Sequence, residues 1–104
     1  MAHKMQSENV PLIIDSYIKL NKLKECEPFV EQSKKVIEIL KNNPLKIYHM
    51  EKIALFYEAN NQPKEALEFN EKVISELVNF PTNPQIEERK KILLNKIESL
   101  KKLI

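Results

Sequence analysis

The sequence repeats itself at an interval of 40 residues, and this interval constrains the fold more than any other feature. Aligning the chain with itself at this offset brings Tyr17 onto Tyr57 and Phe29 onto Phe69. The other coinciding pairs are Ile13 and Ile53, Asn21 and Asn61, Glu25 and Glu65, and Cys26 and Ala66, and the break "NNP" at 42–44 meets "TNP" at 82–84. A hairpin of two helices cannot bury both of its faces alone, so copies of it stack. The repeat therefore predicts two helical hairpins lying side by side.

Apolar residues recur at helical spacing along the chain, and Asn and Pro residues interrupt them. We expect a first helix ending near Asn21, a third over about 45–60, a fourth starting at Gln62-Pro63 and a fifth reaching the C-terminus. Pro28 is expected in the first turn of the second helix, where its missing N–H costs least. A strict offset would place Pro28 further inside that helix. Either the preceding turn is longer in this copy, or the alignment fails there.

The residues at the breaks predict how the helices begin and end. Asn43 is a good N-cap for the third helix. The pair Asn60-Asn61 can take the left-handed conformation that ends a helix where glycine is unavailable. At the last break two N-caps are open, a capping box over 82–85 or a cap by Asn83.

These patterns predict an all-α fold of about five helices, formed by two stacked hairpins and a C-terminal closing helix. We expect one domain over residues 1–104, with repeat one at 8–43, repeat two at 44–80 and the closing helix at 83–104. No run of four residues alternates cleanly between turn markers, so no strand is expected.

Composition excludes several classes of function. The chain has no glycine, which a phosphate-binding loop, a dinucleotide-binding turn and a nucleophile elbow all require. Its 17 Lys and Arg residues nearly balance 15 Asp and Glu residues, so charge alone implies neither nucleic acid nor a membrane surface as a partner. No apolar run approaches the ~20 residues that span a bilayer. A single cysteine, Cys26, suits a reducing compartment, and we expect a cytoplasmic protein.

The residues that could carry catalysis are few. Cys26 and His49 are the candidates for a nucleophile and its base. Cys26 also occupies the small-residue position of a helix pair, and we interpret it as a packing residue. No His or Cys pair has zinc-site spacing, and the scattered glutamates are typical of solvated helix faces. We expect no enzymatic activity, no metal and no cofactor.

The second copy carries a family resemblance. Ile53 and Ala54, a large and a small residue, are followed by Tyr57 one turn later, by Ala66 early in the next helix and then by Phe69. This order resembles the tetratricopeptide repeat, although both glycines of that motif are missing. The period near 40 is similar to the repeat domains of Gram-positive peptide-pheromone receptors and response-regulator phosphatases. The resemblance implies a module that binds proteins or peptides.

The resemblance also implies where a partner would bind. The first helix of each unit would line a concave face, and its mixture of acidic and apolar residues would suit a peptide with basic and apolar side chains. The residues implied are Asp15, Ile18 and Lys19 in the first copy, Tyr48, Glu51, Leu55 and Glu58 in the second, and Lys91 and Asn95, with Glu88 and Glu98, in the closing helix.

Two alternative functions remain open from the sequence. The closing helix has apolar residues outside its main stripe, Ile92, Leu94 and Leu103, which would suit a structural homodimer. The chain would otherwise be a peptide-sensing or response-regulator-binding piece of a larger bacterial regulator.

Overall fold

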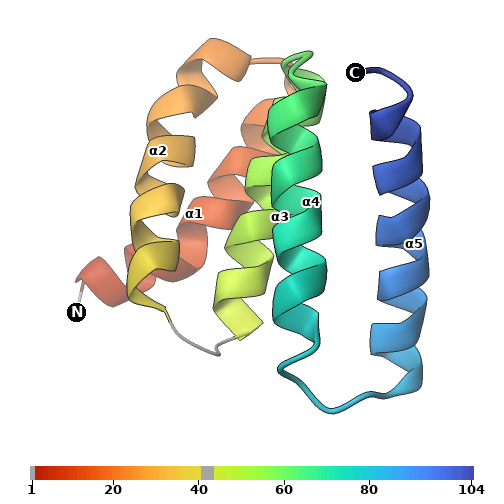
Figure 1. Cartoon of the computed structure of the whole chain (residues 1–104). Coiled ribbons are helices and arrows are strands. Elements are labelled where there is room, and N and C mark those ends of the chain that lie inside the picture. The colour runs from red at the N-terminus through yellow and green to blue at the C-terminus, as the bar shows by residue number, and fades with distance from the viewer. Residues whose placement is uncertain (1, 41–43) are drawn as a thin grey trace.

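A computed structural model describes residues 2–40 and 44–104, with side chains described for 10–40 and 44–104. Within these residues the chain forms five α-helices and no strand, which confirms the predicted all-α fold (Figure 1). The helices are α1 (Ala2–Lys19), α2 (Leu23–Ile39), α3 (Pro44–Ala59), α4 (Pro63–Leu77) and α5 (Pro84–Lys101). The predicted N-cap Asn43 lies outside the described residues.

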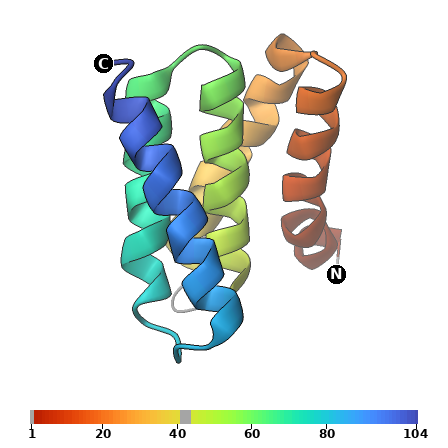
Figure 2. The ribbon, with the colours of Figure 1, turned by 90° about the vertical axis from the view of Figure 1, so that its right-hand side faces the viewer.

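Helix α3 occupies the centre of the fold. It packs against α1, α2 and α4, and Figure 2 shows α1 and α4 on either side of it. An apolar residue on almost any side of α3 therefore meets a neighbouring helix, and this explains why its sequence is apolar on more than one side. The buried residues of α3 are Ile47, His49, Met50, Ile53, Ala54, Phe56 and Tyr57.

The turns that close the two hairpins have the same backbone structure. Asn21 and Asn61 both have positive φ, 58° and 59°. In the first turn the Lys22 N–H donates to the Tyr17 carbonyl, and in the second the Gln62 N–H donates to the Tyr57 carbonyl, each at 2.8 Å. Asparagine tolerates the left-handed conformation better than most residues, so it replaces glycine at these turns. The predicted conformation of Asn61 is confirmed.

The side chains that follow these turns also match at the 40-residue offset. The rings of Tyr17 and Phe29 have centroids 5.6 Å apart, and those of Tyr57 and Phe69 are 5.8 Å apart. Cys26 and Ala66 are both fully buried at the same place in the second helix of each hairpin. The two hairpins thus share their turn, their aromatic pair and a small buried residue at the same position of the second helix.

The structure corrects the expected start of the second helix. Helix α2 begins at Leu23, so Pro28 lies inside it and the 40-residue offset holds without a longer turn. Pro28 has no N–H, so the Lys24 carbonyl lacks the hydrogen bond that it would otherwise accept within the helix. Both residues are exposed, so water can reach this carbonyl. At the last break the Asn83 side chain accepts a hydrogen bond from the Ile86 N–H at 2.9 Å, which decides between the two predicted caps.

Candidate functional site

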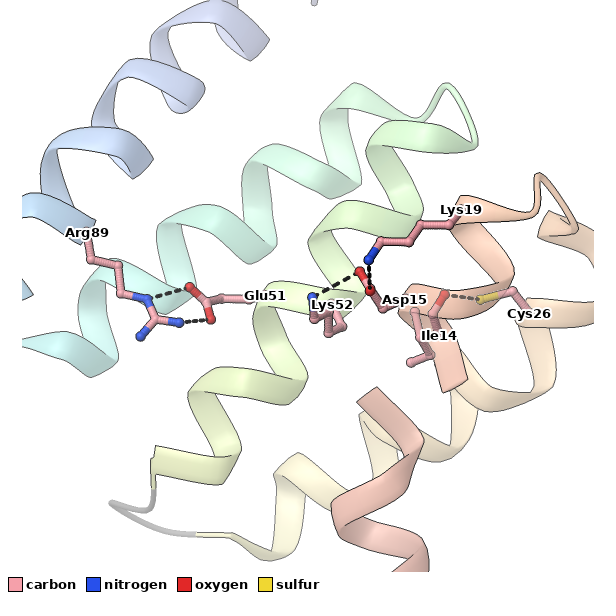
Figure 3. Close-up of polar contacts among 7 residues, drawn as sticks. All are labelled: Ile14, Asp15, Lys19, Cys26, Glu51, Lys52 and Arg89. Carbon is pink, nitrogen blue, oxygen red and sulfur yellow. Dashed lines mark hydrogen bonds and ion pairs between the residues drawn. The ribbon is translucent and has the colours of Figure 1, made fainter. Parts of the chain in front are cut away.

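Two consecutive residues of α3 connect it to helices on opposite sides (Figure 3). The Lys52 ammonium donates to the Asp15 carboxylate of α1 at 3.1 Å. The Glu51 carboxylate accepts two hydrogen bonds from the Arg89 guanidinium of α5, one of them from Nε at 2.7 Å. Because neighbouring residues on a helix point about 100° apart, these two adjacent residues of α3 can reach α1 and α5 on its two sides. We call these residues, with Lys19, Glu58 and Lys96, the polar face.

Asp15 of the polar face is held by two lysines. Its carboxylate contacts Lys19 of the same helix at 3.0 Å as well as Lys52. Hydrogen bonds from Lys19 and then Lys52 hold the pKa of Asp15 below its usual value, and partial burial opposes them only in part. Asp15 is therefore ionised at neutral pH and joins α1 to α3.

The connection between α3 and α5 is made by side chains. No Cα atom of α5 lies within 8 Å of a Cα atom of α3. The gap is bridged by the Glu51–Arg89 pair and by Lys96, whose Nζ lies 3.3 Å from Glu58 Oε2. That oxygen is buried, and it accepts no hydrogen bond from any residue that the structure describes. A cleft of about 190 Å³ lies between these two pairs and is lined by Glu51, Lys52, Leu55, Asn70, Arg89, Ile92, Leu93 and Lys96.

A larger cavity opens at the end of the polar face where α3 and α5 begin. Its volume is about 490 Å³, within the range of pockets that hold small ligands or peptide side chains. Its walls are mainly apolar, and the Arg89 side chain forms part of its border with the polar face. The lining residues are Pro44, Ile47, Tyr48, Leu77, Phe80, Pro81, Asn83, Ile86 and Arg89.

The structure brings together most of the predicted groove residues of α1 and α3. Tyr48 lies below Lys52, whose Nζ is 5.6 Å from the ring centroid, and Leu55 is half-buried in the cleft. Ile18 is half-buried and packs against the core. Asp15, Lys19, Glu51 and Glu58 all belong to the polar face.

The ion pairs from α5 to α3 are made by residues other than the predicted ones. Lys91 and Asn95 are exposed, and neither forms an ion pair or hydrogen bond with any described residue of α3. Arg89 and Lys96 reach α3 instead, with Ile92 between them. The motif register does not identify these residues. Their spacing could have identified them, because residues 89, 92 and 96 lie on one side of a helix.

Cys26 and His49 do not form a nucleophile–base pair. The Cys26 thiol is buried with Sγ 3.8 Å from the Ile14 carbonyl oxygen (Figure 3). His49 Nδ1 is instead hydrogen bonded to Ser33 Oγ. Burial, with a smaller contribution from Glu27, raises the pKa of Cys26 to about 11, so the thiol stays protonated at neutral pH. Among the side chains that the structure describes, no three His, Cys, Asp or Glu residues converge as a metal site.

Comparisons with known proteins give no relative for this chain. No protein-family model matches it, and no curated protein or solved structure matches it at a significant level. In the described part of the chain, no helix has the length and apolar character that crossing a membrane requires.

Proposed function

We propose that this protein is a non-enzymatic, tetratricopeptide-like helical-repeat module that binds a protein or peptide along the polar face. The observation that supports the proposal is the matched backbone of the two hairpins, from the left-handed Asn21 and Asn61 to the equivalent turn hydrogen bonds. In such a repeat α1, α3 and α5 are the first helices of successive units. A partner that lies across them can contact all the units at once.

The partner we propose has apolar and basic side chains. An apolar side chain fits the 490 Å³ cavity beside Tyr48. A basic side chain next to it would compete with Arg89 or Lys96 for the acids of α3, because each of these acids already has an ion-pair partner within the chain. Glu58 is one of them, because the Lys96 ammonium lies 3.3 Å from its Oε2 without forming a well-aligned hydrogen bond, and a better-placed donor would replace it.

The proposal is tested by selecting peptides from a random 12-residue display library on the immobilised protein and then titrating them by fluorescence anisotropy. We expect selected peptides rich in Leu, Phe, Lys and Arg. Tyr48→Ala and Glu58→Lys should each weaken binding by roughly tenfold, as expected for contacts near the centre of an interface. Glu71→Lys is the matched control, because it makes the same charge change at an exposed position of α4. Unchanged binding by both groove variants would remove the polar face as the site.

Self-association is the second candidate function. In α5, Ile92 is 56% exposed and Leu94 is 53% exposed, and Leu103 and Ile104 are exposed just beyond it. Exposed apolar side chains often mark an interface, and a homodimer through α5 would cover those on its outer side. Light scattering over a dilution series tests this idea with Leu94→Glu as the variant. A monomer mass that does not change with concentration excludes it.

A further inference from the structure

A second apolar hollow lies on α1, on a different side of this helix from Asp15 and Lys19. Its volume is about 500 Å³. Leu12 and Leu20 form its rims and are 54% and 64% exposed. Its lining residues are Leu12, Ile13, Ser16, Tyr17, Leu20 and Phe29.

The equivalent surface of the second hairpin is covered. At the 40-residue offset, Ile13 corresponds to Ile53 and Tyr17 to Tyr57. Ile53 and Tyr57 are buried, whereas Ile13 and Tyr17 are half-buried. Helix α2 covers this part of α3, and Lys34 of α2 places its ammonium 4.9 Å from the Tyr57 ring centroid. Around Ile13, Ser16 and Tyr17 the hollow therefore repeats an interface that the chain already forms once. It lacks only the helix that would correspond to α2.

We propose that the hollow receives an amphipathic helix from another protein, seated on α1 as α2 is seated on α3. A second copy of this chain has no helix of the α2 type free to be seated there. The two helices of this type are α2 and α4, and both are already enclosed, α2 by α1 and α3, and α4 by α3 and α5. The proposal concerns a different surface from the polar face and does not depend on the proposed function.

The existing interface also indicates the chemistry of the incoming helix. Val30 is the buried apolar contact of α2 at this surface, and Lys34 lies over the tyrosine ring. Glu27 and Glu31 border the same surface beside Gln62. At the position 40 residues before Gln62 the chain has Lys22. A helix bound at the hollow should therefore combine an apolar stripe with a lysine over Tyr17 and an acid facing Lys22.

The probe for this site is a synthetic peptide that copies α2, residues 23–39, with Cys26→Ser to prevent oxidation. It is titrated to about 1 mM, which detects even weak binding, into the full chain with ¹³C-labelled methyl groups. We expect shifts of the Leu12, Ile13 and Leu20 methyl signals. Leu20→Glu and Ser16→Arg should each lower the affinity at least tenfold, and both residues are exposed, so the fold tolerates the changes. Leu103→Glu is the matched control, and a peptide carrying Val30→Asp should not bind.

Three results would overturn the proposal. The first is the absence of methyl shifts at the highest peptide concentration. The second is equal binding by the wild-type chain and by Leu20→Glu and Ser16→Arg. The third is a concentration-dependent dimer of the protein alone that Ser16→Arg abolishes, because the occupant of the hollow would then be a second copy.

Discussion

The hairpins α1–α2 and α3–α4 have the same turn and the same aromatic pair, yet they bury different amounts of the same surface. Ile53, Phe56 and Tyr57 are buried in the second hairpin, whereas Ile13 and Tyr17 are half-buried in the first and an exposed Ser16 stands where Phe56 would be. The difference comes from the neighbours, since α2 covers α3 and no described helix lies over the equivalent side of α1. Matching sequence positions thus contribute unequally to stability.

The two hairpins also differ in their buried polar groups. Ser33 of α2 is hydrogen bonded to His49 across the boundary between the hairpins, and the equivalent residue of α4 is the apolar Val73. In α4 it is Asn70 that is buried, and its side-chain amide donates to the Ala66 carbonyl at 2.9 Å. Buried polar groups need partners, so Ser33 and His49 favour one particular pairing of helices. Two hairpins with purely apolar faces would lack that discrimination.

The largest expected effect contrasts the two matching isoleucines. Ile53→Ala should lower the free energy of unfolding by about 3 kcal/mol, because it leaves a cavity in the centre of the core. Ile13→Ala should cost about 1 kcal/mol, because its side chain is already partly exposed. Urea unfolding followed by circular dichroism measures both values. Equal losses would mean that the two hairpins are equally covered in solution.

The next effect should be the same in both hairpins. Asn21→Ala and Asn61→Ala place alanine at a positive φ, and each should cost about 1 kcal/mol. Asn21→Gly and Asn61→Gly should cost nothing or slightly stabilise the fold, because glycine adopts this conformation freely. Thermal unfolding of the four variants compares them. A large loss on substitution by glycine would show that the asparagine side chains, rather than the backbone, hold the turns.

The smallest effect concerns Asp15. The second hairpin has no acid at the equivalent position, where the residue is Leu55. The pKa of Asp15 is lowered in the folded state, so its contribution is complete above its unfolded pKa of about 3.9 and is lost as the pH falls through the folded-state value. Asp15→Asn should therefore cost about 0.5–1 kcal/mol at pH 7 and progressively less in acid. Urea unfolding from pH 7 down to pH 3 measures this difference. A constant difference over that range would exclude the ion pair as its cause.

Much of the fold was predictable because the signals are local. Helical spacing and the Asn and Pro breaks predict five helices, and the repeat predicts which turns match. The predicted start of α2 was wrong. The backbone preference of Pro28 favours the first turn of a helix, whereas packing extends this helix back to Leu23. The rule for proline describes an isolated helix. In this chain, an exposed position and a well-packed Cys26 allow the helix to continue through it.

The candidate site was less predictable because ion pairs between helices depend on how those helices are rotated. Asp15, Glu51 and Glu58 were identified by type and register, but their partners Lys52, Arg89 and Lys96 were not. A sequence alone does not reveal that Glu51 meets a residue 38 positions away. A transferred register also assumes that α5 has the rotation of a first helix, and it selected Lys91 and Asn95, whereas the ion pairs to α3 come from Arg89 and Lys96.

The two ion pairs between α3 and α5 make this edge of the fold sensitive to the salt concentration of the buffer. The screening length falls from about 10 Å at 0.1 M salt to about 3 Å at 1 M, so concentrated salt weakens Glu51–Arg89 and Glu58–Lys96 while the apolar packing of α4 on α5 persists. Ionic strength then determines how strongly α5 is held against α3. Affinities measured for this protein are comparable only when they are determined at the same salt concentration.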